Sequence, residues 1–285
     1  MTVPTVDDQV PQVAAWIAES RRTVALTGAG ISTDSGIPDF RGPNGVWTKD
    51  PAAAALFTID NYVRDPAVRR RAWLTRRDNP AWTARPNPGH LALVDLERAG
   101  RLDVIVTQNI DELHQRAGSD PDRVIELHGT MYQVVCLDCG DRAPMARALE
   151  RVAAGEEDPA CPRCGGILKS ATISFGQRLD ETTLRRAISH VAECDLLLAI
   201  GTSLQVHPAA GLVDLALGAG ARVVIVNAER TPYDADAHAV LRAPIGEALP
   251  ALARSLSSAA GQRRDSGGGG RGSPSWGSGS HSTGR

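Results

Sequence analysis

The chain has 285 residues, of which 42% are hydrophobic and 22% charged, which is ordinary for a globular protein, and its length suits one large domain or a major and a minor one. Lys and Arg number 31 against 33 Asp and Glu, and the resulting net charge of −2 argues against a generic nucleic-acid binder, so no specific nucleic-acid binding is expected. No apolar run is long enough to span a membrane and no signal-peptide pattern begins the sequence, so we expect a cytoplasmic protein without membrane contact.

Short apolar runs rich in β-branched residues alternate with helical patterns along most of the chain. Four such runs have the character of buried parallel strands, at 23–27, 103–107, 195–200 and 222–226. Helical patterns at 90–99 and 208–217 lie between them. This alternation predicts an α/β fold, a Rossmann-like doubly wound parallel sheet with helices on both faces.

Two segments interrupt the alternation and are interpreted as insertions. Residues 50–88 are rich in Arg, Ala and Pro and predict a helical insertion, and residues 129–170 contain four of the five cysteines. Together they are expected to form a smaller zinc-binding and helical domain beside the sheet. The larger domain is then expected to consist of about 8–49, 89–128 and 171–258.

The end of the chain differs in composition from the rest. Gly and Ser predominate there, and such a segment cannot bury enough apolar surface to offset its ordering entropy. We therefore expect the folded domain pair to span 1–258 and residues 259–285 to form a disordered tail.

A glycine loop follows the first predicted strand. Gly28-Ala29-Gly30 is the kind of turn that lets backbone N–H groups approach a pyrophosphate. Thr33, however, stands where the ordinary dinucleotide fingerprint has its third glycine, and no strand ending in an acidic residue follows about 20 positions later. On these residues alone, dinucleotide binding and a plain tight turn stay equally open, and a hydride-transferring dehydrogenase is disfavoured.

Polar residues or glycines follow the other predicted strands. Gln108-Asn109, Gly201 and Asn227 each come just after a strand, and the carboxyl edge of an open parallel sheet is where ligands bind. Loop capping by the Asn109 and Asp111 side chains is the alternative explanation for those two residues. The occurrence of polar residues or glycines at the ends of several predicted strands favours a ligand site.

The cysteines form two close pairs. Cys136-x-x-Cys139 and Cys161-x-x-Cys164 are separated by 21 residues, and two such pairs can close a tetrahedral site around one Zn²⁺. Four thiolates leave no open coordination position, so the predicted metal is structural. Disulfide or redox pairs are the alternative, and Cys194 is expected to be a small core residue.

The first loop continues as Gly36-Ile37-Pro38-Asp39-Phe40-Arg41-Gly42, and with this signature the chain resembles the NAD-dependent deacylases of the sirtuin (Sir2) family. Further matches follow in the family's order between about Thr23 and Leu256, at Thr107-Gln108-Asn109-Ile110-Asp111, Leu113-His114, Glu126-Leu127-His128-Gly129, the four cysteines, Gly201-Thr202-Ser203-Leu204 and Val226-Asn227. The resemblance implies a bacterial, zinc-containing NAD-dependent protein lysine deacetylase. Such an enzyme releases nicotinamide, O-acyl-ADP-ribose and free lysine. A mono-ADP-ribosyltransferase and a non-catalytic NAD-sensing module are the alternatives.

The resemblance also assigns roles to residues. It implies that His128 is the catalytic base, that Asn109 positions water and a ribose hydroxyl, and that Asp111 helps bind the nicotinamide carboxamide. Isolated histidines are usually structural, and His90, His114 and His207 keep that interpretation. The implied NAD-binding residues are Gly28, Ala29, Gly30, Ser32, Asp34, Ile37, Asp39, Phe40, Arg41, Trp47, Gln108, Asn109, Ile110, Asp111, Gly201, Thr202, Ser203, Asn227, Ala228, Glu229 and Ile245.

The resemblance further implies an acyl-lysine peptide as partner, bound as an added strand. The implied contacts are Phe175, Gly176, Gln177 and Val206, and the family more often has Glu or Asn where Gln177 stands. Relatives that remove acidic acyl groups carry Tyr-x-x-Arg in the helical insertion, whereas this chain has Trp73-x-x-Arg76. We therefore expect acetyl-lysine to be preferred over succinyl-lysine.

Overall fold

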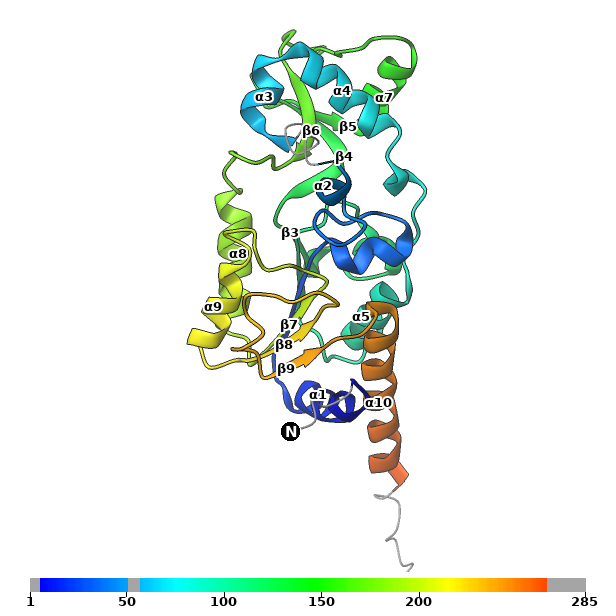
Figure 1. The fold of residues 1–285 in the computed structure, drawn as a ribbon, viewed down its shortest axis with the longest axis vertical. Coiled ribbons are helices and arrows are strands. Elements are labelled where there is room, and N and C mark those ends of the chain that lie inside the picture. Colours follow the sequence, from blue (N-terminus) through cyan, green and yellow to red (C-terminus); the bar gives the residue numbers. More distant parts are fainter. Residues whose placement is uncertain (1–5, 51–56, 266–285) are drawn as a thin grey trace, which may run out of the picture.

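The larger of two sheets has six parallel strands in the order β3-β2-β1-β7-β8-β9, in a computed structural model that describes residues 6–50 and 57–265 (Figure 1). These strands are β1 (Thr23–Thr27), β2 (Val104–Thr107), β3 (Val124–Glu126), β7 (Leu196–Ile200), β8 (Arg222–Val226) and β9 (Ala239–Leu241). The chain builds outward from β1 through β2 to β3 on one side, and from β7 to β9 on the other. The strand order therefore reverses between β1 and β7, which confirms the predicted doubly wound sheet.

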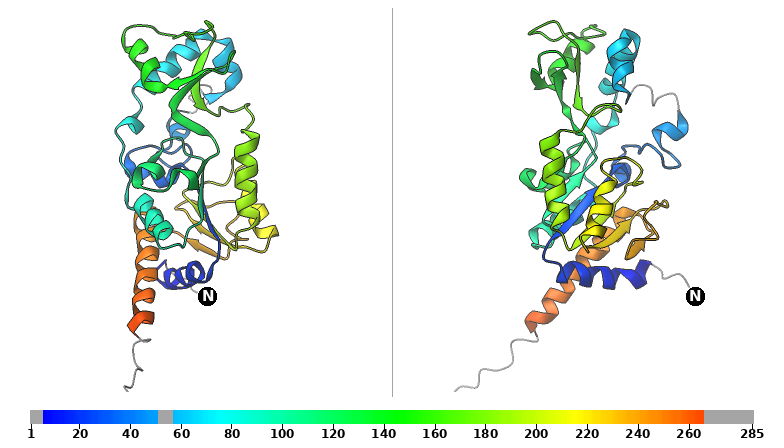
Figure 2. Two further views of the ribbon diagram at one scale, coloured as in Figure 1. Left: turned by 180° about the vertical axis from the view of Figure 1, so that it is seen from behind. Right: turned by 90° about the vertical axis from the view of Figure 1, so that its left-hand side faces the viewer.

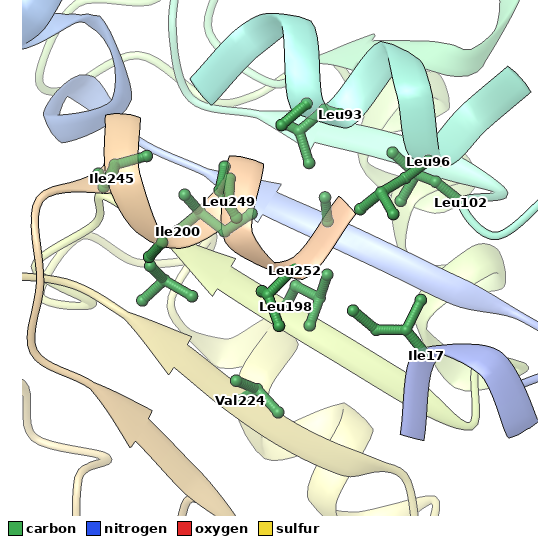
Figure 3. Packing of buried hydrophobic residues seen from close by; sticks show 14 of the residues in the cluster. Ile17, Leu93, Leu96, Leu102, Leu198, Ile200, Val224, Ile245, Leu249 and Leu252 are labelled. Carbon is green, nitrogen blue, oxygen red and sulfur yellow. The ribbon is translucent and has the colours of Figure 1, made fainter. Parts of the chain in front are cut away.

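Both faces of this sheet are buried because its strands are apolar at successive positions. Ala25 faces one core cluster and Val24 faces the other. Helices α1 (Val6–Glu19), α5 (Pro88–Arg98) and α10 (Ile245–Asp265) cover the first face, where Ile17, Leu93 and Leu249 pack together (Figure 3). Helices α8 (Glu181–Ala192) and α9 (Gly211–Gly218) cover the second face (Figure 2).

The two insertions form one smaller module, seen at the top of Figure 1. Its antiparallel sheet has the order β5-β4-β6, with β4 (Gly129–Cys136), β5 (Arg142–Pro144) and β6 (Leu168–Thr172). Helices α3 (Ile59–Arg64), α4 (Pro66–Arg77) and α7 (Met145–Ala153) complete it. Trp73 of α4 packs against Val134, Met145 and Leu168, so the two insertions share a single core. The domain boundaries given above stay predictions.

Local sequence explains where several helices begin. Asp65 caps α4 by accepting a bond of 2.8 Å from the Ala67 amide, and Pro66 occupies the first helical position. Asn87 caps α5 in the same way, and its side-chain nitrogen also donates to the carbonyl of Ile31 at 2.7 Å. The start of α5 is thereby tied to the glycine loop after β1.

Strand β9 and helix α10 extend beyond the sequence prediction. Strand β9 was not predicted, because it is a three-residue edge strand that is only partly buried. Helix α10 continues to Asp265, past the predicted end of the fold at 258, and the remainder of the predicted tail lies outside the described residues. Within the described part of the chain, no helix is long and apolar enough to cross a membrane.

Candidate active site

The loops that follow β1 and β7 are in close contact where the strand order reverses. Gly28 donates its amide to the Ile200 carbonyl at 3.0 Å, and Gly30 donates to the Gly201 carbonyl at 2.8 Å. A Cβ atom on Gly201 would lie 2.4 Å from the Ile31 nitrogen, and its φ of +60° is itself unfavourable for other residues. These glycines therefore permit the close approach of two loops, and all three of their amides are bonded within the protein, that of Gly201 to the Val226 carbonyl.

Ser32 joins the first loop to the turn after β2 (Val104–Thr107). Its hydroxyl donates to Asp111 Oδ2 at 2.7 Å and accepts from Asn109 Nδ2 at 3.2 Å. Asn109 Nδ2 also donates to the Gly28 carbonyl at 3.2 Å. Burial raises the pKa of Asp111, while hydrogen bonds from the Leu113 amide and the Ser32 hydroxyl oppose that shift. Three residues with predicted roles thus form one buried network.

His128 lies directly after β3 (Val124–Glu126), beside this network. Its Nδ1 atom is 2.9 Å from the carbonyl oxygen of Gln108. Because a carbonyl can only accept, Nδ1 carries the proton and Nε2 is the basic nitrogen of the neutral ring. Burial lowers the pKa of His128, and the bond to Gln108 opposes that shift. Gln108 Nε2 donates to Thr202 Oγ1 at 2.9 Å, which links this strand end to the loop after β7.

An aromatic cluster joins the loop after β1 to the predicted peptide segment. Phe40 lies 4.9 Å from Trp47 and 5.7 Å from Phe57 between ring centroids, and Trp47 lies 5.4 Å from Phe175. The Arg41 guanidinium is 4.5 Å from the centroid of the Trp47 ring. The loop after β1, the helical insertion and the predicted peptide segment therefore meet at one cluster.

The four paired cysteines come together as predicted. The Sγ atoms of Cys136 and Cys164 are 3.5 Å apart, those of Cys139 and Cys161 are 3.8 Å apart, and all four lie within 4.8 Å of one another. Thiolates on one tetrahedral Zn²⁺ are separated by about 3.8 Å, since each Zn–S bond is about 2.3 Å. The donor set therefore fits zinc. None of the five cysteines forms a disulfide bond, which removes the disulfide alternative. Cys194 is buried as expected, and burial raises its pKa to about 11.

Residues 28–208 match the Sir2 family. The chain belongs to this family. The NAD-dependent protein deacetylase 2 of Streptomyces coelicolor is 56% identical over 231 residues, which cover 81% of this chain and 96% of that protein. One solved structure, from work on the mechanism and regulation of Sir2 enzymes, has a TM-score of 0.81 and 39% identity and covers 89% of this chain and 99% of its own. Another contains a Sir2 variant with a deacetylated p53 peptide and 3′-O-acetyl ADP ribose, with a TM-score of 0.79, 36% identity and coverage of 88% and 98%.

The predicted peptide segment of this Sir2 chain pairs with the helical insertion. Phe175 donates its amide to the Phe57 carbonyl at 2.8 Å, and Ile59 donates to the Phe175 carbonyl at 3.0 Å. Gln177 accepts a bond of 2.9 Å from the Ser174 amide through its side-chain oxygen. The Gln177 side chain therefore closes its own turn, while Phe175 is 44% exposed.

Asn227 follows β8 (Arg222–Val226), on the opposite side of β7 from the His128 network. It is buried, and its Nδ2 atom donates to the Glu229 carbonyl at 2.8 Å. Ile245, at the start of α10, lies against the loop after β7, with its Cδ1 atom 2.9 Å from where a Gly201 Cβ would be. The predicted NAD-binding residues thus extend along the carboxyl edge of the sheet.

The other predicted residues lie on the same loops. Asp39 accepts a bond of 3.1 Å from the Gly42 amide, and the Ile110 carbonyl accepts one of 3.0 Å from Met131. The remainder of the set is Ala29, Asp34, Ile37, Ser203, Gly176, Val206 and Ala228.

The Trp73 and Arg76 pair belongs to the core of the small module. Trp73 is fully buried, and the Arg76 guanidinium lies 5.2 Å from the ring centroids of both Trp73 and Tyr62. The Tyr62 hydroxyl donates to the Leu168 carbonyl at 2.7 Å. Arg76 Nη1 and Trp73 Nε1 are both buried without a hydrogen-bond partner among the described residues.

Sequence reasoning missed two contributors to the site. The Phe57 ring packs against Phe40, and the Phe57 carbonyl accepts a bond from the Phe175 amide. Phe57 lies in the helical insertion, and no local sequence pattern predicts that this insertion pairs with Phe175. Arg242 donates to the Asn227 carbonyl from fifteen positions further along the chain, and a single arginine after a short edge strand gives no sequence signal.

Proposed function

We propose that the chain is an NAD-dependent protein lysine deacetylase that releases nicotinamide, O-acyl-ADP-ribose and free lysine. The observation that carries the proposal is that Asn109 and Asp111, which follow β2, are bonded to the loop after β1 at the reversal of strand order, while His128, which follows β3, is bonded to the neighbouring Gln108. A dinucleotide placed there has one nucleoside beside this junction and the other beside Asn227. Members of the same family named as NAD-dependent deacetylases support this assignment.

His128 acts as the general base in this proposal, and its lowered pKa keeps the ring neutral near pH 7. The acyl oxygen first replaces nicotinamide at C1′ of the ribose. His128 Nε2 then takes the proton of a ribose hydroxyl as that hydroxyl attacks the acyl carbon, and water completes the release of free lysine and O-acyl-ADP-ribose. The Gln108 carbonyl fixes the tautomer and stabilises the positively charged ring formed when the proton arrives. Asn109 positions the ribose hydroxyl and water, and Asp111 binds the nicotinamide carboxamide.

The aromatic cluster excludes bulk water from the reacting carbon. Cleavage of nicotinamide from ribose passes through an oxocarbenium-like state, which water would intercept. Phe40, packed against Trp47 and Phe57, shields the reacting carbon from water and from returning nicotinamide. Arg41, stacked on Trp47, contacts the phosphates.

The metal has a structural role in this proposal. Cys136, Cys139, Cys161 and Cys164 hold one Zn²⁺ whose four positions they fill, so it stabilises the fold of the small module and takes no part in the reaction. We place the boundaries of that module at 50–88 and 129–170. Five unpaired cysteines fit a reducing compartment, and we therefore place the protein in the cytoplasm.

The substrate is an acyl-lysine in a protein or peptide. A strand-like peptide between Phe175-Gly176-Gln177 and Val206 is held through main-chain bonds, which demand little of its sequence. Phe175 already pairs its backbone with the helical insertion, and its exposed ring forms one wall for the peptide.

Mass spectrometry of a reaction with NAD and an acetyl-lysine peptide tests the proposal. A deacetylase converts the peptide to its free-lysine form and produces nicotinamide and O-acetyl-ADP-ribose in equal amounts. A peptide that keeps its acetyl group and gains ADP-ribose would instead identify a mono-ADP-ribosyltransferase. A peptide and NAD that both stay intact would support a non-catalytic module.

A further inference from the structure

Arg242 follows strand β9 (Ala239–Leu241) and binds the loop that follows β8. Its Nη1 atom donates to the Asn227 carbonyl at 3.0 Å and also to the Glu229 carbonyl, and its Nη2 atom donates to the Asp234 carboxylate. A single guanidinium therefore holds three points of the segment between residues 227 and 234.

The same segment has internal bonds that complete the arrangement. Asp234 accepts bonds from the amide and the hydroxyl of Thr231 at 3.1 and 2.8 Å, and so orders the middle of the loop. Asn227 Nδ2 donates to the Glu229 carbonyl, the group that Arg242 also binds. This bond leaves the side-chain carbonyl of Asn227 as the group that can accept a hydrogen bond from a ribose hydroxyl.

Charge attraction alone does not explain this arrangement. The side chains of Arg242 and Asp234 are 33% and 25% exposed, and partly exposed ion pairs contribute little to stability. The value of an arginine here lies in its planar fork, which can satisfy two carbonyls and a carboxylate at once. A lysine has the charge but offers no fixed fork.

We propose that Arg242 is a positioning residue for the end of NAD opposite the nicotinamide. It acts through Asn227 without touching the dinucleotide. This inference rests on the proposed function, because that function places one nucleoside beside Asn109 and His128 and the other beside Asn227.

The experiment compares Arg242→Ala and Arg242→Lys with the wild type and with Arg185→Ala. Arg185 is an exposed arginine of α8 with a comparable single carboxylate partner, Glu181 at 3.7 Å. Loss of hydrogen bonds from a charged donor should raise both the KM for NAD and the Kd for ADP-ribose about 10-fold in Arg242→Ala. Arg242→Lys should lie in between, and Arg185→Ala should match the wild type.

Other constants separate positioning from a structural role. For Arg242→Ala we expect an unchanged KM for the peptide, an unchanged inhibition constant for nicotinamide and a kcat close to the wild-type value. A lower Tm together with a lower kcat and an unchanged KM for NAD would show that Arg242 only stabilises the fold, which overturns the inference. Arg242→Lys retains the charge and applies the same test if Arg242→Ala fails to fold.

Different results would reject the proposed deacetylase function and the positioning role of Arg242. A wild-type protein that does not consume NAD would reject the proposed function. Calorimetry with ADP-ribose would still decide the inference, since an equal Kd for the wild type and both Arg242 variants overturns it.

Discussion

Thr130 Oγ1 donates a hydrogen bond of 2.8 Å to Glu112 Oε1, and this bond ties the strand after His128 to the turn that contains Asp111. Glu112 has a left-handed backbone with φ of 55°, a conformation that costs a residue with a Cβ roughly 1–2 kcal/mol. This hydrogen bond, called the Thr130–Glu112 brace below, therefore fixes the position of His128 relative to Asp111. Its favourable free energy offsets part of the backbone strain at Glu112.

Removing either side of the brace should reduce catalysis to the same extent. Glu112→Ala and Thr130→Val should each lower kcat/KM, and the double variant should be little worse than either, with a coupling energy of about 1 kcal/mol. Steady-state kinetics on the four proteins measure this coupling, with Glu181→Ala as the exposed-carboxylate control. Effects that simply add would show that the two side chains act independently.

The pH dependence of activity should follow His128. Burial lowers its pKa below the usual value of about 6.5, and the base works only when neutral. We expect kcat/KM to fall as the pH drops through that lowered pKa and to stay level from there to about pH 8.

Glu126 supplies the control for this profile, because burial raises its pKa to about 7 and it lies two residues from His128. Glu126→Gln removes that titration and should leave the acid limb of the profile where it is. An acid limb that disappears in Glu126→Gln, or activity that rises toward low pH, would argue against His128 as the base.

The metal site should support folding. Cys161→Ala removes one of four thiolates whose sulfurs lie within 4.8 Å of one another, so we expect zinc loss, a lower Tm and reduced activity together. Elemental analysis of wild type should give one zinc per chain. Cys194→Ala, which changes a buried cysteine outside the site, should retain the metal. Folded, active wild-type protein without metal would refute this account.

Acyl preference should favour acetyl. Trp73 is fully buried, and the Arg76 guanidinium lies against two rings with its Nη1 atom unpartnered among the described residues. The prediction rests on Trp73, because its bulkier ring differs in shape from the Tyr that the resemblance associates with acidic acyl groups, and an unpaired buried carboxylate is costly. We expect kcat/KM for an acetyl peptide to exceed that for a succinyl peptide by ~10-fold or more, equivalent to about 1.4 kcal/mol.

Arg76→Ala distinguishes packing from acyl recognition. Loss of the stacking should lower the free energy of unfolding by about 1 kcal/mol or more, while the ratio of acetyl to succinyl activity stays the same. Desuccinylation that is the faster reaction in wild type and collapses in Arg76→Ala would show that Arg76 reads the acyl group.

Sequence predicted the parts of this protein that depend on consecutive residues. Val104 to Val106 is a continuous apolar, β-branched run and therefore predicts a buried strand, and the spacing of Cys136 and Cys139 predicts a pair of metal ligands. Contacts between distant segments could not be read in this way. The pairing of Phe57 with Phe175 and the reach of Arg242 to Asn227 depend on where loops meet, which no local period encodes.

Transfer of a heavy-isotope-labelled acetyl group tests the central claim most directly. Wild-type protein given NAD and a peptide labelled in its acetyl-lysine should place the label in O-acetyl-ADP-ribose. His128→Ala should abolish that product, a loss on the order of 10²–10⁴-fold in rate, while still binding NAD. His190→Ala, which removes a histidine bonded to Asp103 at 3.1 Å, should behave as wild type. Label released as free acetate with NAD unconsumed, or transfer at the wild-type rate by His128→Ala, would contradict the account.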